Sequence, residues 1–92
     1  MPLYAVTYDL NKTKNYPKLW AEFDRLGGQK AAESFYLLDV TSANATILRD
    51  HLRSFIDNDD TLIVVPMNSR PSTYRAKAGT KEWLDSKFGV YA

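Results

Sequence analysis

The chain has 92 residues, which suffices for one modest hydrophobic core and is too short for two independent domains. Apolar residues make up 45% and charged residues 25%, an ordinary globular composition that argues against wholesale disorder. The 12 Lys and Arg nearly balance the 11 Asp and Glu, so no global field attracts nucleic acid or an anionic membrane. Any such binding needs a local patch.

The sequence has no cysteine, which excludes disulfides, thiolate catalysis and cysteine metal sites. Its single histidine, His51, also weakens any zinc proposal. The first residues lack the basic and long apolar stretches of a targeting segment, and every apolar run is far shorter than a membrane span. We therefore expect a cytoplasmic protein with no membrane partner.

The first half of the chain alternates between extended and helical patterns. Residues 3–8 are rich in β-branched and aromatic side chains on both faces, which predicts a central strand. Apolar side chains at helical spacing predict a helix over residues 16–26, and Gly27-Gly28 ends it. Residues 29–40 are extended again, as either one kinked strand or two short ones.

The second half begins with another helix, for which Thr41 or Ser42 is the expected cap. An acidic turn at residues 57–60 ends this region, and a buried strand follows at residues 61–65, where Pro66 should stop it. Beyond it we predict a loop at residues 68–79, a short helix at 80–87 and an edge strand at 88–91.

If residues 29–40 supply two strands, the order is βαββαβ. That is the order of an α+β ferredoxin-like sandwich with an antiparallel sheet. We place the ferredoxin-like core at residues 1–67 and a C-terminal extension of the same domain at residues 68–92.

Several short segments in this order carry a family resemblance. They are Tyr8-Asp9-Leu10 after the first strand, Gly27-Gly28, Ser34-Phe35-Tyr36 and, after the second helix, Asp60-Thr61-Leu62-Ile63-Val64. Over residues 3–67 the chain resembles the CRISPR-associated protein 2 family and the wider group that includes virulence-associated protein D toxins.

The resemblance implies a homodimer in which the aspartate after the first strand faces its symmetry mate. In some family members that aspartate binds a divalent metal for cleavage of RNA or DNA. Asp9 matches this position, so the resemblance implies a catalytic and metal-binding role for Asp9 with Mg²⁺ or Mn²⁺. Two carboxylates at a two-fold axis repel each other until a hard cation neutralises them, which is consistent with that role.

From the residues alone, Asp9 also suits an Asx turn or a cap on the approach to the first helix, since Asn11 is nearby. Ser34 occupies the position of a family serine, but no base lies at triad spacing. We therefore expect Ser34, like Tyr8, to support Asp9 rather than to act as a nucleophile.

Two features differ from the family pattern. Lys12, Lys14 and Lys18 stand where members often carry arginines, and Ala32 stands where a glutamine precedes the serine. Lysine meets phosphate as a point charge and lacks the planar fork of arginine, while Ala32 offers no polar group.

Two other polar features have simpler interpretations. The second helix has an apolar stripe at helical spacing, made of Ile47, Leu48, Leu52, Phe55 and Ile56. His51 lies beside this stripe, which favours a partly buried helix histidine over a metal ligand. Asp57, Asp59 and Asp60 lack the spacing of a calcium loop, so we predict a solvated turn.

Residues 68–81 contain Tyr74 and four cations but no acidic residue. Such a segment can follow a phosphate backbone while the tyrosine stacks on a base, although a mobile and merely solvating loop has the same composition. We predict nucleic-acid contacts at Lys12, Lys14, Arg70, Arg75 and Lys77.

Two functions follow. The first is a metal-dependent nuclease acting on RNA or DNA, of which a toxin is a variant. The second is a non-catalytic dimeric adaptor that binds nucleic acid or protein. The sequence leaves open which nucleic acid, metal and biological pathway are involved.

Overall fold

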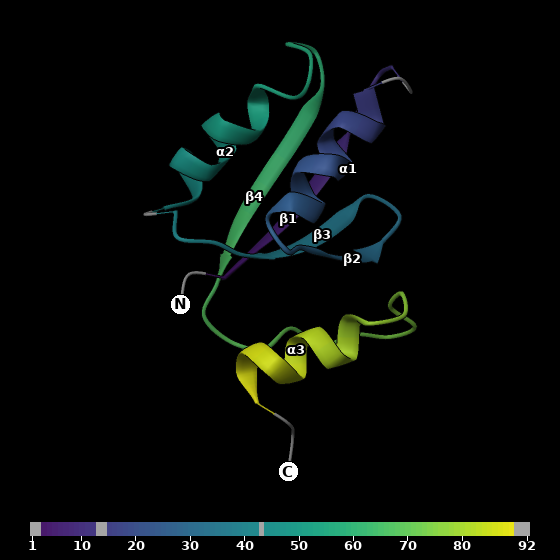
Figure 1. Cartoon of the computed structure of the whole chain (residues 1–92), viewed down its shortest axis with the longest axis vertical. Coiled ribbons are helices and arrows are strands. Elements are labelled where there is room, and N and C mark those ends of the chain that lie inside the picture. The colour runs from purple at the N-terminus through teal and green to yellow at the C-terminus, as the bar shows by residue number, and fades with distance from the viewer. Residues whose placement is uncertain (1–2, 13–14, 43, 90–92) are drawn as a thin grey trace.

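The computed structural model describes residues 3–12, 15–42 and 44–89. Its elements in chain order are β1 (Leu3–Asp9), α1 (Tyr16–Arg25), β2 (Gln29–Ala32), β3 (Phe35–Asp39), α2 (Ala45–Arg53), β4 (Thr61–Met67) and α3 (Thr80–Phe88). They form one antiparallel sheet in the order β2-β3-β1-β4, and the predicted ferredoxin-like α+β fold is confirmed (Figure 1). In the described ranges no helix has the length and apolar character needed to cross a membrane.

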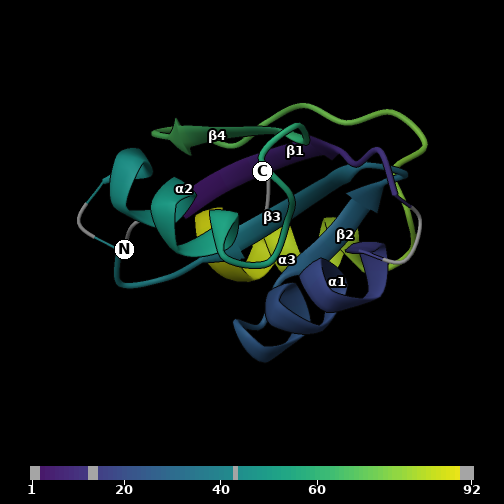
Figure 2. The same ribbon diagram turned by 90° about the horizontal axis from the view of Figure 1, so that it is seen from above.

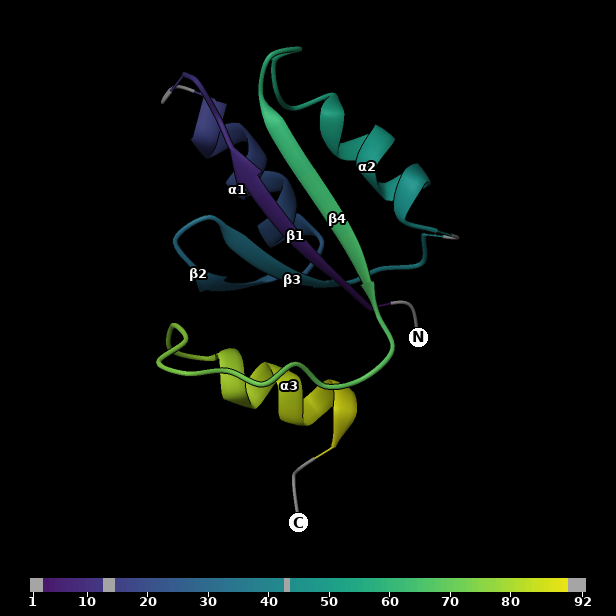
Figure 3. The ribbon, with the colours of Figure 1, turned by 180° about the vertical axis from the view of Figure 1, so that it is seen from behind.

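Two helices cover one face of the sheet, and a third helix covers part of the other face. Helix α1 lies in front of β1 in Figure 1 and behind it in Figure 3. Helix α2 belongs to the same layer, because its buried residues share one core with those of α1. Alternate β1 side chains, Tyr4, Val6 and Tyr8, point into this layer, because successive side chains of a strand face opposite sides. Residues from both helices complete the main core: Leu19, Phe23, Leu48 and Leu52.

Helix α3 covers only part of the opposite face, and in Figure 2 it is seen behind β3. Its buried Leu84 packs with Ala5, Ala31 and Leu37, one residue from each of three strands. On β4, by contrast, Ile63 and Val65 remain 51% and 48% exposed. Figure 3 shows this side, where the upper parts of β1 and β4 have no helix over them. The uncovered area is called the open face below.

Three predictions of where helices and strands begin and end were wrong, and so was the predicted burial of one strand. The N-cap of α2 is Asn44, whose Oδ1 accepts a hydrogen bond from the Ile47 N–H at 2.9 Å, and neither Thr41 nor Ser42 has this role. Strand β4 is not the buried strand that we predicted, because it lies at a sheet edge and each of its residues is exposed or half-buried. It also continues through Pro66, which an edge strand tolerates because it has a neighbour on one side only. Phe88 ends α3 instead of beginning a strand, and residues 90–91 lie outside the described residues.

A buried carboxylate joins the two helices of the main layer. Glu22 of α1 accepts hydrogen bonds from Arg25 Nε and Nη2 at 2.7 and 2.6 Å. His51 Nε2 of α2 lies 2.5 Å from the same carboxylate, so this histidine is an exposed surface partner of Glu22 and not a partly buried one. Arg25 first, and His51 second, lower the pKa of Glu22 to about 2 although its burial opposes this.

The loop after β1 is clamped to the loop before β4. Asp60 accepts hydrogen bonds from the backbone N–H groups of Asn11 and Asp57, both at 2.8 Å. Asp57 accepts from Lys12 Nζ at 3.0 Å and from Asn15 Nδ2 at 2.9 Å. We call these four contacts the loop clamp. It holds the backbone immediately beyond Asp9.

Replacing Glu22 by glutamine should lower the free energy of unfolding at pH 7 by about 1–3 kcal/mol, because a buried charged acceptor is lost. Since the folded pKa is depressed from 4.5 to about 2, the advantage of the wild type is complete above about pH 4.5 and shrinks as the pH falls toward 2. Urea unfolding of both proteins at several pH values between 2 and 7 measures this difference in stability. Glu33→Gln, at a side chain 88% exposed, is the control, and equal effects of the two variants would contradict the prediction.

Asp60→Asn should weaken the loop clamp, because an amide offers one acceptor oxygen where the carboxylate uses two. We expect a stability loss of about 1 kcal/mol and faster amide hydrogen exchange at Asn11 and Asp57. The matched control is Asp59→Asn, since the Asp59 contact to Asn11 uses only its backbone carbonyl. Unchanged exchange at both amides in Asp60→Asn would show that the clamp does not order this loop.

Candidate functional site

Asp9 is the last residue of β1, opposite Thr61 of β4, and its side chain is exposed. It shares a face with Thr7 and with Ile63, the residue paired with Thr7, because side chains two residues apart lie on one side. The Asn11 N–H, which an Asx turn of Asp9 would use, donates instead to Asp60. Among the described residues, no hydrogen bond or ion pair occupies the Asp9 carboxylate. It is therefore available to an external group.

Tyr8 and Ser34, the two residues predicted to support Asp9, make different kinds of contact near it. The Tyr8 N–H donates to the Ser34 carbonyl at 3.2 Å, so the β2–β3 turn pairs with the end of β1 through its backbone. The Tyr8 side chain points to the opposite face from Asp9, where Trp20 Nε1 donates to its hydroxyl at 2.7 Å. Burial raises the pKa of Tyr8 to about 12, so this phenol stays neutral. Tyr8 thus anchors the strand end in the core.

Two of the predicted phosphate contacts are engaged within the protein. Lys12 pairs with Asp57, and this hydrogen bond raises the pKa of the lysine. Arg70 Nη1 donates to Asp85 Oδ1 at 2.7 Å and to the Gly89 carbonyl at 2.9 Å, with only 10% of its side chain exposed. Lys81 first, and Arg70 second, lower the pKa of Asp85. Arg70 therefore attaches α3 to the loop that precedes it.

Arg75 and Lys77 are exposed beside each other on that loop. Lys77 Nζ lies 3.6 Å from a Glu33 carboxylate oxygen, while Arg75 has no ion pair among the described residues. The remaining predicted contact, Lys14, lies outside the described residues. The structure thus separates Arg75 and Lys77, which face solvent, from Lys12 and Arg70, which hold loops together.

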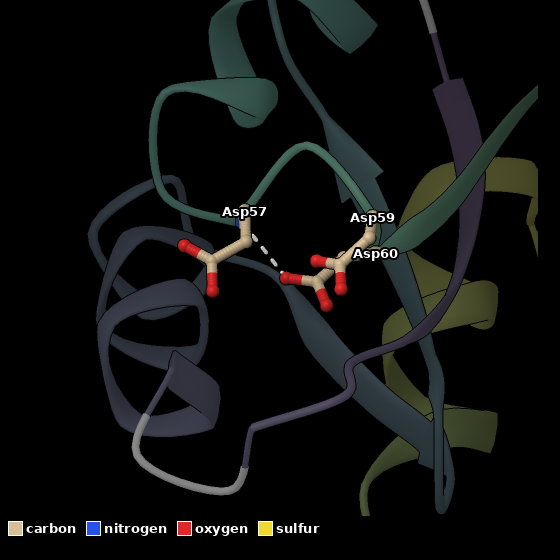
Figure 4. A group of neighbouring side chains, drawn as sticks. All are labelled: Asp57, Asp59 and Asp60. Carbon is tan, nitrogen blue, oxygen red and sulfur yellow. Dashed lines mark hydrogen bonds between the residues drawn. The ribbon is translucent and has the colours of Figure 1, made fainter.

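Three neighbouring carboxylates, on Asp57, Asp59 and Asp60, have ligand oxygens within 4.8 Å of one another (Figure 4). The dashed line in Figure 4 marks the bond from the Asp57 N–H to Asp60. Asp57 and Asp60 are already acceptors in the loop clamp, so this turn is more ordered than the solvated turn that we predicted. The sequence contains a signal for this contact that we missed. One segment, with Asn11, Lys12 and Asn15, supplies hydrogen-bond donors, and the acidic turn supplies the acceptors.

Comparison with known proteins agrees with the fold. The family model described as CRISPR associated protein Cas2 matches residues 1–73, a range that contains all four strands and ends before α3. Among solved structures, the hypothetical protein TT1823 from Thermus thermophilus is similar, with a TM-score of 0.67 and 23% sequence identity. The match covers 79% of this chain and 89% of that chain, and it shows the shared fold. The chain belongs to the CRISPR associated protein Cas2 family.

Proposed function

We propose that this protein is a metal-dependent nuclease that cleaves phosphodiester bonds of RNA or DNA as a homodimer with paired Asp9 carboxylates. The observation that carries the proposal is the Asp9 carboxylate itself. It is exposed at a strand end, and among the described residues it has no internal partner. Membership of the Cas2 family supports a nuclease-like function for the protein.

The open face supports the dimer. Ile63 and Val65 are large apolar side chains that are about half exposed, and they lie on the same side of the sheet as Asp9. Burying them against a second copy would be favourable, and a two-fold axis pairs each surface with itself. In such a dimer Asp9 at the rim of the face would approach the Asp9 of its partner.

The donor chemistry fits the proposed ion. Carboxylate oxygens are the protein ligands that Mg²⁺ and Mn²⁺ prefer, and Asp9 from each copy would hold the ion. When bound, such an ion lowers the pKa of water and neutralises phosphate charge. The chain's own contribution is to position Asp9, through the Tyr8–Ser34 backbone bond on one side and the loop clamp on the other.

A non-catalytic adaptor is the second candidate, and one observation favours it. Lys12, which follows Asp9 where the family often has an arginine, is paired with Asp57 and lacks a bidentate guanidinium. An adaptor would bind nucleic acid in a salt-dependent manner without turnover and without depending on Asp9.

Asp9→Asn should reduce cleavage by at least about 100-fold, because the variant loses the charged metal ligands but keeps their shape. The assay incubates labelled RNA and DNA with Mg²⁺, with Mn²⁺ and with chelator. Asp24→Asn, an exposed acid on α1, is the matched control and should cleave like the wild type. Cleavage that is absent from a dimeric wild type, or equal in Asp9→Asn, would favour the adaptor.

Ile63→Lys should abolish the dimer, because the substitution places like charges across the proposed two-fold. We expect the dissociation constant to rise at least about 100-fold. Light scattering after size exclusion at micromolar concentration measures the mass, and circular dichroism checks the fold. Ile47→Lys is the matched control, since Ile47 is 52% exposed on α2, in the opposite layer. A monomeric wild type at these concentrations would exclude the paired-carboxylate arrangement.

A further inference from the structure

A groove of about 460 Å³ lies between the β2–β3 turn and the loop that leads to α3. Its walls include the small side chains of Ala31 and Ala32, the half-buried ring of Phe35, and Tyr74 and Arg75 from the loop. This volume is within the range of about 300–1,000 Å³ that is usual for ligand pockets. The small residues leave space beside the two aromatic side chains of the lining.

The loop that forms one wall is held in place at several points. The Lys77 N–H donates to the Ala31 carbonyl at 3.0 Å, which attaches the loop to β2. Gln29 Nε2 donates to the Ala78 carbonyl at 3.0 Å, and Arg70 binds Asp85 at the other end of the loop. The groove is therefore formed before any ligand arrives, which reduces the entropy lost on binding. This differs from the mobile loop that the sequence also allowed.

Two residues on this loop, Tyr74 and Arg75, make no side-chain hydrogen bond or ion pair within the part of the chain that the structure describes. Tyr74 is 88% exposed, so its ring leaves most of its apolar surface in water. Arg75 has φ of 57°, and among the described residues it alone, apart from glycines, has a positive φ. Such a conformation is disfavoured for arginine, and backbone strain of this kind is concentrated at ligand-binding sites.

The chemistry of the groove fits a nucleotide. Aromatic rings such as those of Tyr74 and Phe35 stack on bases of any sequence, and Arg75 and Lys77 supply positive charge for the adjoining phosphates. Glu33 is the one carboxylate in the lining, and it already lies 3.6 Å from Lys77. We infer that this groove binds an unpaired nucleotide of a single-stranded nucleic acid. A duplex does not fit this mode, because its bases are covered by their stacked neighbours.

The groove also has a defined relation to Asp9. Phe35 pairs with Thr7, and Asp9 lies two residues further along β1 on the same face, a step of about 7 Å. The groove and Asp9 therefore lie near the same end of β1, and a strand with one base in the groove has only a short further span to the rim where Asp9 lies. If the proposed nuclease function holds, the groove identifies the substrate of that nuclease as single-stranded. Binding in the groove itself needs neither metal nor dimer.

Fluorescence anisotropy with labelled 12-residue single strands of RNA and of DNA, in EDTA, tests the inference. We expect Tyr74→Ala to weaken single-strand binding by about 5- to 150-fold and Tyr74→Phe to retain it, because the ring supplies the stacking. Arg75→Ala and Arg75→Gly should both weaken binding and reduce the salt slope by about 0.7. Comparing the RNA and DNA arms identifies which sugar the groove accepts.

Arg53→Ala is the matched control, because Arg53 is an exposed arginine on α2 in the opposite layer. It should bind like the wild type. Because the assay contains EDTA and measures binding alone, it separates failure of the groove from failure of cleavage. The inference is overturned if Tyr74→Ala binds as tightly as the wild type, if duplexes bind as tightly as single strands, or if the wild type binds neither RNA nor DNA single strands.

Discussion

The position of β1 in the sheet constrains the rest of the molecule. β1 pairs with β3 on one edge and β4 on the other, so its backbone cannot shift without breaking two ladders. Its side chains must alternate between the helical layer and the opposite face. Tyr8 is consequently buried under α1, and Asp9 is consequently exposed. A slip of one residue would exchange them and bury a carboxylate without a partner.

The charged side chains divide into those that stabilise the fold and those that remain available for binding. Glu22 joins α1 to α2, the loop clamp joins the loops beside Asp9, and Arg70 attaches α3 through Asp85. Groups with close internal partners would lose them on meeting a phosphate or a metal. Asp9 and Arg75 have no ion pair among the described residues, and binding would cost them no such contact. The proposed chemistry is therefore assigned to these two.

Helix α3 determines how much of the second face remains open. It packs over Ala5, Ala31 and Leu37 and leaves the β4 side chains Ile63 and Val65 exposed. The loop that leads into α3 forms one wall of the groove because Arg70 and Lys77 attach it at separate points. The C-terminal segment made of this loop and α3 thus forms one wall of the groove and also determines how far the proposed dimer surface extends.

The sequence by itself determined most of the elements, their order and the place of Asp9 at a strand end, because hydrophobic periodicity and turn residues act locally. It left open whether residues 29–40 form one strand or two, and the structure has the two strands β2 and β3 there. Tertiary structure decided what depends on distant partners. Pro66 continues β4 because that strand lies at an edge, and Arg70 is buried because Asp85, on α3, faces it. The choice of Asn44 as cap, among several nearby candidates, depended on where the chain enters α2. The groove exists because a loop and a hairpin far apart in the sequence meet, and no local pattern encodes that contact.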